Sequence, residues 1–151
     1  MDLKTLKLAT LLLTPERLDA FVTYQRTMLS ELAQRSSGDW SGRYAFAHGK
    51  ALAESKLDLV DYGKLKALVG DFCGRRSAYQ QVKARIDAAT EKDAPLLARA
   101  KTELPKLNDM SAFEARHGAE ALALLRSREE ELVKLHRELA HLEGGGHVHI
   151  S

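Results

Sequence analysis

The sequence predicts an all-α protein, an elongated antiparallel bundle of about five helices in which the third and the fifth are long. The chain has 151 residues and only three prolines. It is rich in Ala, Leu, Glu, Lys and Arg, which lose little conformational entropy in a helix. Apolar residues recur at steps of three and four along most of the chain, the spacing of one helix face. Only 6–13 and 147–151 could also be extended, so helices packed on helices are expected.

The first predicted helix begins at "TPE". Thr14 suits the N-cap, Pro15 the first helical position, and Glu16 the positive end of the helix dipole. Its apolar face reaches to about Arg35, before the turn residues "SSGDWSG" end the helix. A second helix is expected from Ser41 to Lys56. Trp40 precedes it and either packs back onto the helix as a hydrophobic staple or anchors a partner protein.

The third predicted helix begins at Asp58 and continues to the segment "TEKDAP". A row of small residues runs along it: Gly63, Ala67, Gly70, Gly74, Ser77, Ala84 and Ala88. Each glycine inside a helix lowers its stability by about 1 kcal/mol relative to alanine, so three of them in one helix need a structural or functional explanation. We expect another helix backbone to approach closely here. Two alternatives are a groove around Gly70 and Gly74 where a partner helix or ligand docks, and a helix end at Gly74. The unbroken apolar stripe favours one continuous helix.

A short helix is expected from Asp93 to Glu103, because Pro105 disfavours helix in the residue before it. The fifth helix then begins at a Ser111–Glu114 capping box and ends at Gly144. Its apolar positions alternate steps of four and three, as in helices that wrap around another helix. These positions are Ala121, Leu125, Arg128, Leu132, Leu135, Leu139 and Leu142. Residues 1–143 thus form one helical domain, and 144–151 a flexible Gly/His tail.

Arg128 falls on the apolar seam of the fifth helix. A guanidinium is costly there unless it reaches an acid or the rim, and it can fix the packing register. A second basic feature is the segment that holds Arg75, Arg76, Lys83 and Arg85. A solvent-exposed face explains it better than a nucleic-acid site, since the formal net charge is only +2 and no nucleic-acid-binding motif is present.

Histidines near the C-terminus raise a metal hypothesis. His147 and His149 project to the same side if the tail is extended, and His141 could supply a third ligand with Glu138. A zinc or iron site is the alternative interpretation. Three glycines before His147 make it entropically costly, so we expect no cofactor.

The lone cysteine, Cys73, excludes an internal disulfide and lies on the apolar stripe of the third helix. We therefore expect a buried thiol and not a nucleophile. The apolar run near the N-terminus is too short for a membrane span and lacks a signal-peptide cleavage site. A cytoplasmic protein is predicted; the alternative is a mature exported domain without its signal peptide.

These observations predict a non-enzymatic helical module that acts by self-association or by contact with another protein. No phosphate-binding glycine loop and no catalytic constellation is present in the sequence. The metal-binding bundle is the alternative function. The candidate interaction residues are Trp40, Gly70, Gly74, Arg75, Arg76 and Arg128.

Overall fold

The protein is all-α, as predicted. This computed structural model describes residues 12–34, 40–90 and 94–148, with the side chains of these ranges up to Leu142. Within these ranges every regular element is a helix. The helices are α2 (Pro15–Gln34), α3 (Trp40–Ser55), α4 (Leu59–Ala88), α5 (Ala94–Asn108), α6 (Ser111–His117), α7 (Ala119–Ser127) and α8 (Glu129–Val148).

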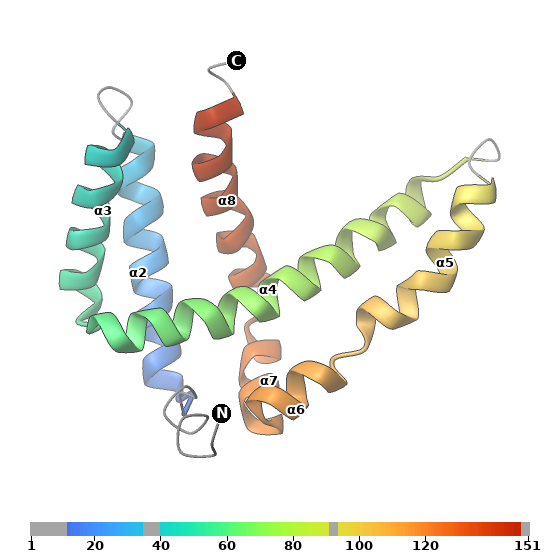
Figure 1. The fold of residues 1–151 in the computed structure, drawn as a ribbon, viewed down its shortest axis with the longest axis horizontal. Coiled ribbons are helices and arrows are strands. Elements are labelled where there is room, and N and C mark those ends of the chain that lie inside the picture. The colour runs from blue at the N-terminus through green and yellow to red at the C-terminus, as the bar shows by residue number, and fades with distance from the viewer. Residues whose placement is uncertain (1–11, 35–39, 91–93, 149–151) are drawn as a thin grey trace, which may run out of the picture.

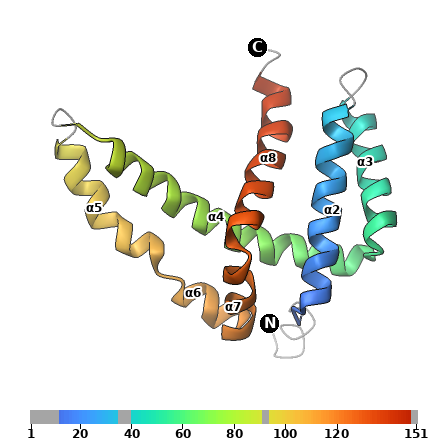
Figure 2. The ribbon, with the colours of Figure 1, turned by 180° about the vertical axis from the view of Figure 1, so that it is seen from behind.

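Helix α4 organises the molecule (Figure 1). Its first half lies across α2 and α8, while its second half leaves them and pairs with α5. The view from behind shows the same two parts, a compact group of helices and a projecting arm made of α4 and α5 (Figure 2). Helices α2 and α3 are antiparallel, but α2 and α8 run in the same direction and α4 crosses both. The arrangement therefore differs from a purely antiparallel bundle.

The helix starts of α2 and α4 follow the predicted capping. The side-chain oxygen of Thr14 accepts a hydrogen bond from the backbone N–H of Arg17 at 3.1 Å. Asp58 caps α4 in the same way and accepts from the N–H of Asp61 at 2.7 Å. In both cases a short polar side chain satisfies a first-turn donor that has no partner inside the helix. The predicted end of the first helix at Arg35 lies outside the described residues.

The glycines of α4 do not mark a close contact with another helix backbone, so the prediction is wrong at these three positions. A Cβ atom built on Gly63, Gly70 or Gly74 would meet no heavy atom within 4 Å. Helix α4 is also continuous through Gly74, as the apolar stripe indicated. The stripe itself is buried only at its beginning, from Leu65 to Phe72. Its later members Val82 and Ile86 are half-buried, and α5 is the main described helix that packs on this part of α4.

The predicted fifth helix is divided into α6, α7 and α8. Gly118 interrupts it with φ of +98°, a conformation that glycine adopts readily. Arg128 interrupts it a second time, between α7 and α8. The Ser111 capping box is absent: the Asp109 carboxylate instead accepts the N–H of Ser111 at 2.9 Å. Helix α8 in turn continues past Gly144 to Val148.

The prediction that Pro105 stops the fourth helix is also wrong, because α5 continues through it to Asn108. Proline removes one backbone hydrogen bond from a helix interior. No residue of α5 is buried, so the carbonyl left without a donor lies in a helix that solvent reaches. The cost is smaller there than in a packed core.

The core is formed where α2, α4 and the last three helices meet. Phe72 and Phe113 are fully buried, with ring centroids 5.9 Å apart. Leu125 and Leu132 from the predicted seam are also fully buried, although they lie on different helices. The breaks at Gly118 and Arg128 therefore leave the apolar seam facing the core.

Replacing glycines tests the open space beside α4. We expect Gly74→Ala to raise the free energy of unfolding by up to about 1 kcal/mol, because alanine restricts the unfolded chain and favours helix. Gly118→Ala should lower it by about 1–3 kcal/mol, since its backbone conformation is unfavourable for alanine. Urea unfolding measures both. A Gly74→Ala protein less stable than the wild type would mean that another backbone does pack on this residue.

Candidate functional site

The arm of α4 and α5 carries an apolar groove of about 550 Å³. Val82 and Ile86 of α4 lie on one side of it, and Leu96, Leu97 and Ala100 of α5 on the other. Its polar lining residues are Arg85, Arg99 and Glu103. The groove thus has an apolar floor with charged residues beside it, the usual composition of a surface that binds another molecule.

Helix α5 is unusual because its 15 residues include none that is buried. Leu96 is 71% exposed. Short helices in proteins are stabilised mainly by packing of an apolar face, and among the described helices α5 packs chiefly on α4. Among the described residues, the apolar face of the arm is therefore incompletely covered.

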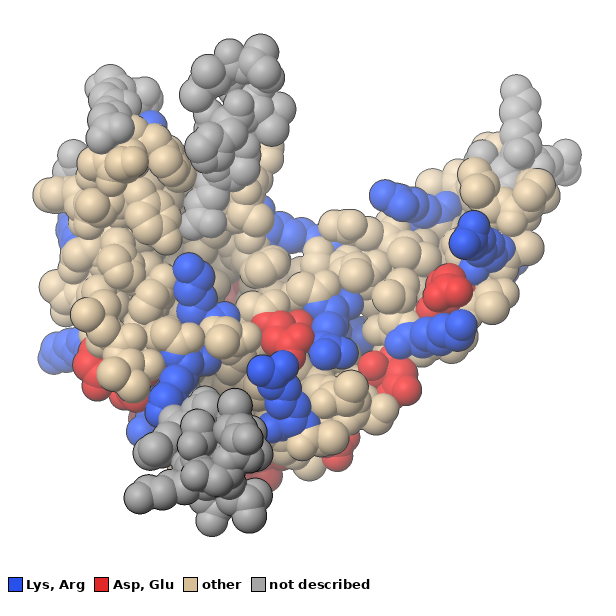
Figure 3. All heavy atoms as spheres, in the orientation of Figure 1, with Lys and Arg blue, Asp and Glu red and all other residues tan. Residues whose placement is uncertain are grey.

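The arm is predominantly basic. Figure 3 shows Lys and Arg side chains along it, with acidic side chains between them. In its described part the basic residues Lys83, Arg85, Arg99, Lys101 and Lys106 outnumber the acidic Asp87 and Glu103. A positive potential beside an apolar groove favours an acidic partner.

Three predicted interaction residues, Gly70, Gly74 and Arg75, line a depression at the base of the arm, together with Lys106 of α5. Asp71 lies among them and accepts a hydrogen bond from Arg75 at 2.8 Å. Burial would raise the pKa of the Asp71 carboxyl, but hydrogen bonds from Arg75 and His117 outweigh it and lower the pKa. The depression is therefore held by an internal network of charges.

Arg76 is not a surface residue, contrary to both the interaction and the solvent-exposed interpretations. It is 4% exposed. Its guanidinium donates to the Asn108 side chain at 2.8 Å and lies over the Tyr79 ring, 4.6 Å from the centroid. Its Nε is 3.1 Å from Glu129, an ion pair without the alignment of a hydrogen bond. Arg76 thus joins α4 to the end of α5 and the start of α8.

Trp40 is the first residue of α3 and packs on its own helix. Its ring lies 6.2 Å from that of Tyr44, and the Arg43 guanidinium lies 5.3 Å from its centroid. Trp40 therefore packs back onto α3, through an aromatic and a polar side chain of its first turn. Trp40 is half-buried against the core, which is a structural role.

The guanidinium of Arg128 contacts acidic side chains. This is the condition under which arginine is expected at a position of the apolar seam. Its guanidinium donates to Glu131 at 2.8 and 3.0 Å and also pairs with Asp19 of α2. Glu131 in turn pairs with Arg26 of α2. These charges link α2 to the junction of α7 and α8, so Arg128 connects helices within the chain.

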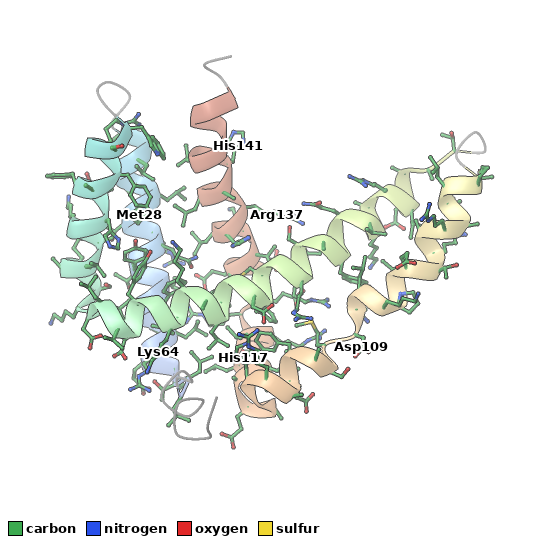
Figure 4. All side chains as sticks on the ribbon, in the orientation of Figure 1. Met28, Lys64, Asp109, His117, Arg137 and His141 are labelled. Carbon is green, nitrogen blue, oxygen red and sulfur yellow. The ribbon has the colours of Figure 1, made fainter. Side chains whose placement is uncertain are left out.

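The metal hypothesis receives no support from the described residues, where no group of three His, Cys, Asp or Glu side chains could hold an ion. The carboxylate Oε1 of Glu138, one of the predicted ligands, lies 3.9 Å from Nζ of Lys134. Figure 4 shows His141 high on α8, with His117 far below it on α6. His117 contacts Asp71 at 3.2 Å. The side chain of His147 and all of His149 lie outside the described residues.

Cys73 is fully buried, as predicted. Burial, assisted by the negative charge of Glu129, raises the pKa of its thiol to about 12. A thiol in this state carries almost no thiolate at neutral pH and is a poor nucleophile.

The apolar groove of the arm was missed by the sequence reasoning. The pattern of α5, with apolar residues at 96, 97, 100, 104 and 107, does mark one helix face. That face could have been found by the same spacing rule. The spacing does not show how much of this face the neighbouring helix α4 would cover.

Comparison of the chain with protein-family models, curated proteins and solved structures finds no match. Among the helices described, none combines the length and apolar character that crossing a membrane requires.

Thiol labelling tests the burial of Cys73. We expect a disulfide reagent at pH 8 to label the native protein about a hundredfold more slowly than the protein unfolded in urea, because reaction requires local or global opening. Absorbance of the released thiolate follows both reactions. Rapid labelling of the folded protein would contradict the buried position.

Arg128→Leu tests the charge network at the α7–α8 junction. We expect a loss of about 1 kcal/mol in the free energy of unfolding, because the acids of the network lose a shared partner. The loss should shrink in 1 M salt, where the screening length falls to about 3 Å. Arg126→Leu, at an exposed neighbouring arginine, is the control and should be close to neutral. A more stable Arg128→Leu protein would show that the network does not hold the junction.

Proposed function

We propose that the protein is a non-enzymatic interaction module whose arm binds a helix of another protein. The observation that carries this proposal is the groove between α4 and α5, lined by Leu96 and Leu97 in a helix without one buried residue. Apolar side chains left at the surface in a groove gain free energy when a second apolar surface covers them. An amphipathic helix is the element that fits a groove between two helices.

The charges of the arm specify the partner further. The groove is flanked by Arg85 and Arg99, and the arm as a whole is basic. The expected partner helix has apolar residues at steps of three and four and acidic residues beside them. Complementary charge of this kind increases the association rate and discriminates against basic partners.

A second copy of the chain is a poorer occupant than a different protein. A symmetric pair brings the same patch of each copy together, so arm-on-arm packing would place basic residues opposite basic residues. Like charges in an interface disfavour association. We therefore propose a different, acidic protein, and the test distinguishes it from self-association.

A photo-crosslinking amino acid at position 96 tests the proposal in the cells that express the protein. The control carries it at position 59, because Leu59 is 68% exposed but lies at the opposite end of α4. We expect adducts at position 96 at least about fivefold above those at position 59, the ratio that about 1 kcal/mol of preference gives. Mass spectrometry should place the crosslink in an acidic amphipathic segment.

Charge reversal completes the test. Arg99→Glu should reduce the adduct at position 96, whereas Arg116→Glu, at an exposed arginine of α6, should leave it unchanged. Equal yields at positions 96 and 59 would contradict the proposed groove. Adducts with the mass of two copies of this chain would instead show self-association.

A further inference from the structure

The two helices of the arm depend on each other for packing. No residue of α5 is buried, and neither is any of residues 78–88, the part of α4 that lies in the arm. The half-buried side chains of α5 fall at steps of three and four and so share one helix face. They are Leu97, Ala100, Leu104 and Leu107. Leu97 and Ala100 line the groove together with Val82 and Ile86 of α4, so each helix supplies much of the packing of the other.

The first half of α4 is held much more firmly. Leu65, Leu68, Val69, Phe72 and Cys73 are all buried in the core of the compact group. The free energy needed to open a segment locally rises with the apolar surface that the segment buries. Helix α4 is therefore one continuous helix whose two halves differ widely in what holds them.

The C-terminal end of α5 is fixed to the compact group. The buried guanidinium of Arg76 donates a hydrogen bond to the side-chain oxygen of Asn108, the last residue of α5, at 2.8 Å. Among the described residues, this is the polar side-chain contact that joins α5 to another helix. Met110, two residues further on, is buried in the core. Leu96, near the opposite end of α5, is instead largely exposed, so the two ends of α5 are held very differently.

We propose that the arm opens as one unit, separately from the compact group, by pivoting about the contact between Arg76 and Asn108. In the closed form α5 lies along residues 78–88 of α4 and the groove is present. In the open form α5 leaves α4. Residues 78–88 then lose their main packing partner, and their helical order is lost with it, because a helix end without packing is only marginally stable in water.

The opening regulates the groove to which we assign a partner helix, and this consequence rests on the proposed function. A partner that binds only the closed form shifts the arm toward it. Its apparent affinity is reduced by the fraction of molecules whose arm is open. The opening itself is a property of the chain alone and is measured without a partner. Failure of the opening would therefore leave the groove as a candidate site, and failure to find a partner would leave the opening.

Hydrogen exchange of the backbone amides of the full chain, followed by two-dimensional NMR at pH 7, tests the proposal. After correction for intrinsic rates, we expect residues 80–86 and 98–104 to exchange at least about a hundredfold faster than residues 65–73, because they open without unfolding of the core. The two arm segments should agree within about threefold, since one cooperative opening exposes both.

A matched pair of leucine variants tests the coupling of the two segments. Leu97→Ala shortens a half-buried side chain on the face of α5 that lines the groove. It should speed exchange about tenfold in 80–86 and in 98–104 alike, and leave 65–73 unchanged. Leu96→Ala makes the same change at the exposed neighbouring position and should alter the rates by less than about twofold. Circular dichroism checks that each variant is folded.

A second pair tests the pivot. Asn108→Ala removes the acceptor of the Arg76 hydrogen bond and should speed exchange of the amides at 106–108 about tenfold, because hydrogen bonds to charged groups are among the stronger ones. Asn108→Asp keeps an acceptor oxygen at the same place and should retain the slow exchange of the wild type.

Three results would overturn the proposal. The first is exchange in the arm as slow as in residues 65–73. The second is a Leu97→Ala effect confined to α5, which would show that the two segments open independently. The third is unchanged exchange at 106–108 in Asn108→Ala, which would show that α5 does not pivot about this contact.

Discussion

The length of α4 is the constraint on which the rest of the structure depends. Its 30 residues span about 45 Å, whereas the helices that cross it, α2 and α8, have 20 residues each. Since it crosses them at a steep angle, they cover only its first half (Figure 1). Burial of Leu65, Phe72 and their neighbours holds that half in the core. The second half must then project, and α5 returns along it to reach α6, which creates the arm.

The features of the fold that depend on interactions between residues close in sequence, such as helix caps, were predicted from the sequence. The caps at Thr14 and Asp58 need only a side chain and a backbone N–H three residues later, so they are visible in the sequence. The breaks at Gly118 and Arg128 were not predicted, because the leucine period continues across them. A helix can break and still keep its apolar residues facing the core if the next segment resumes at the right rotation.

The sites were less predictable, because they depend on contacts distant in the sequence. In the sequence, Arg76 is one residue of a basic cluster. Its burial against Glu129 and Asn108 depends on residues that are distant in the sequence. For the glycines of α4, the sequence instead predicted an interaction that the structure does not contain. Their spacing resembled a helix contact, yet a Cβ atom built on Gly70 would meet no heavy atom within 4 Å.

The absence of any buried residue in α5 has a consequence for how this chain can change over time. Mutations in a packed core are removed by selection because they unfold the protein, whereas exposed positions are close to neutral for folding. Residues of α5 such as Leu96 and Arg99 can therefore vary with little effect on whether the chain folds. Substitutions in α5 would therefore change the surface of the arm, and with it the proposed partner specificity, while leaving the folded core unaltered.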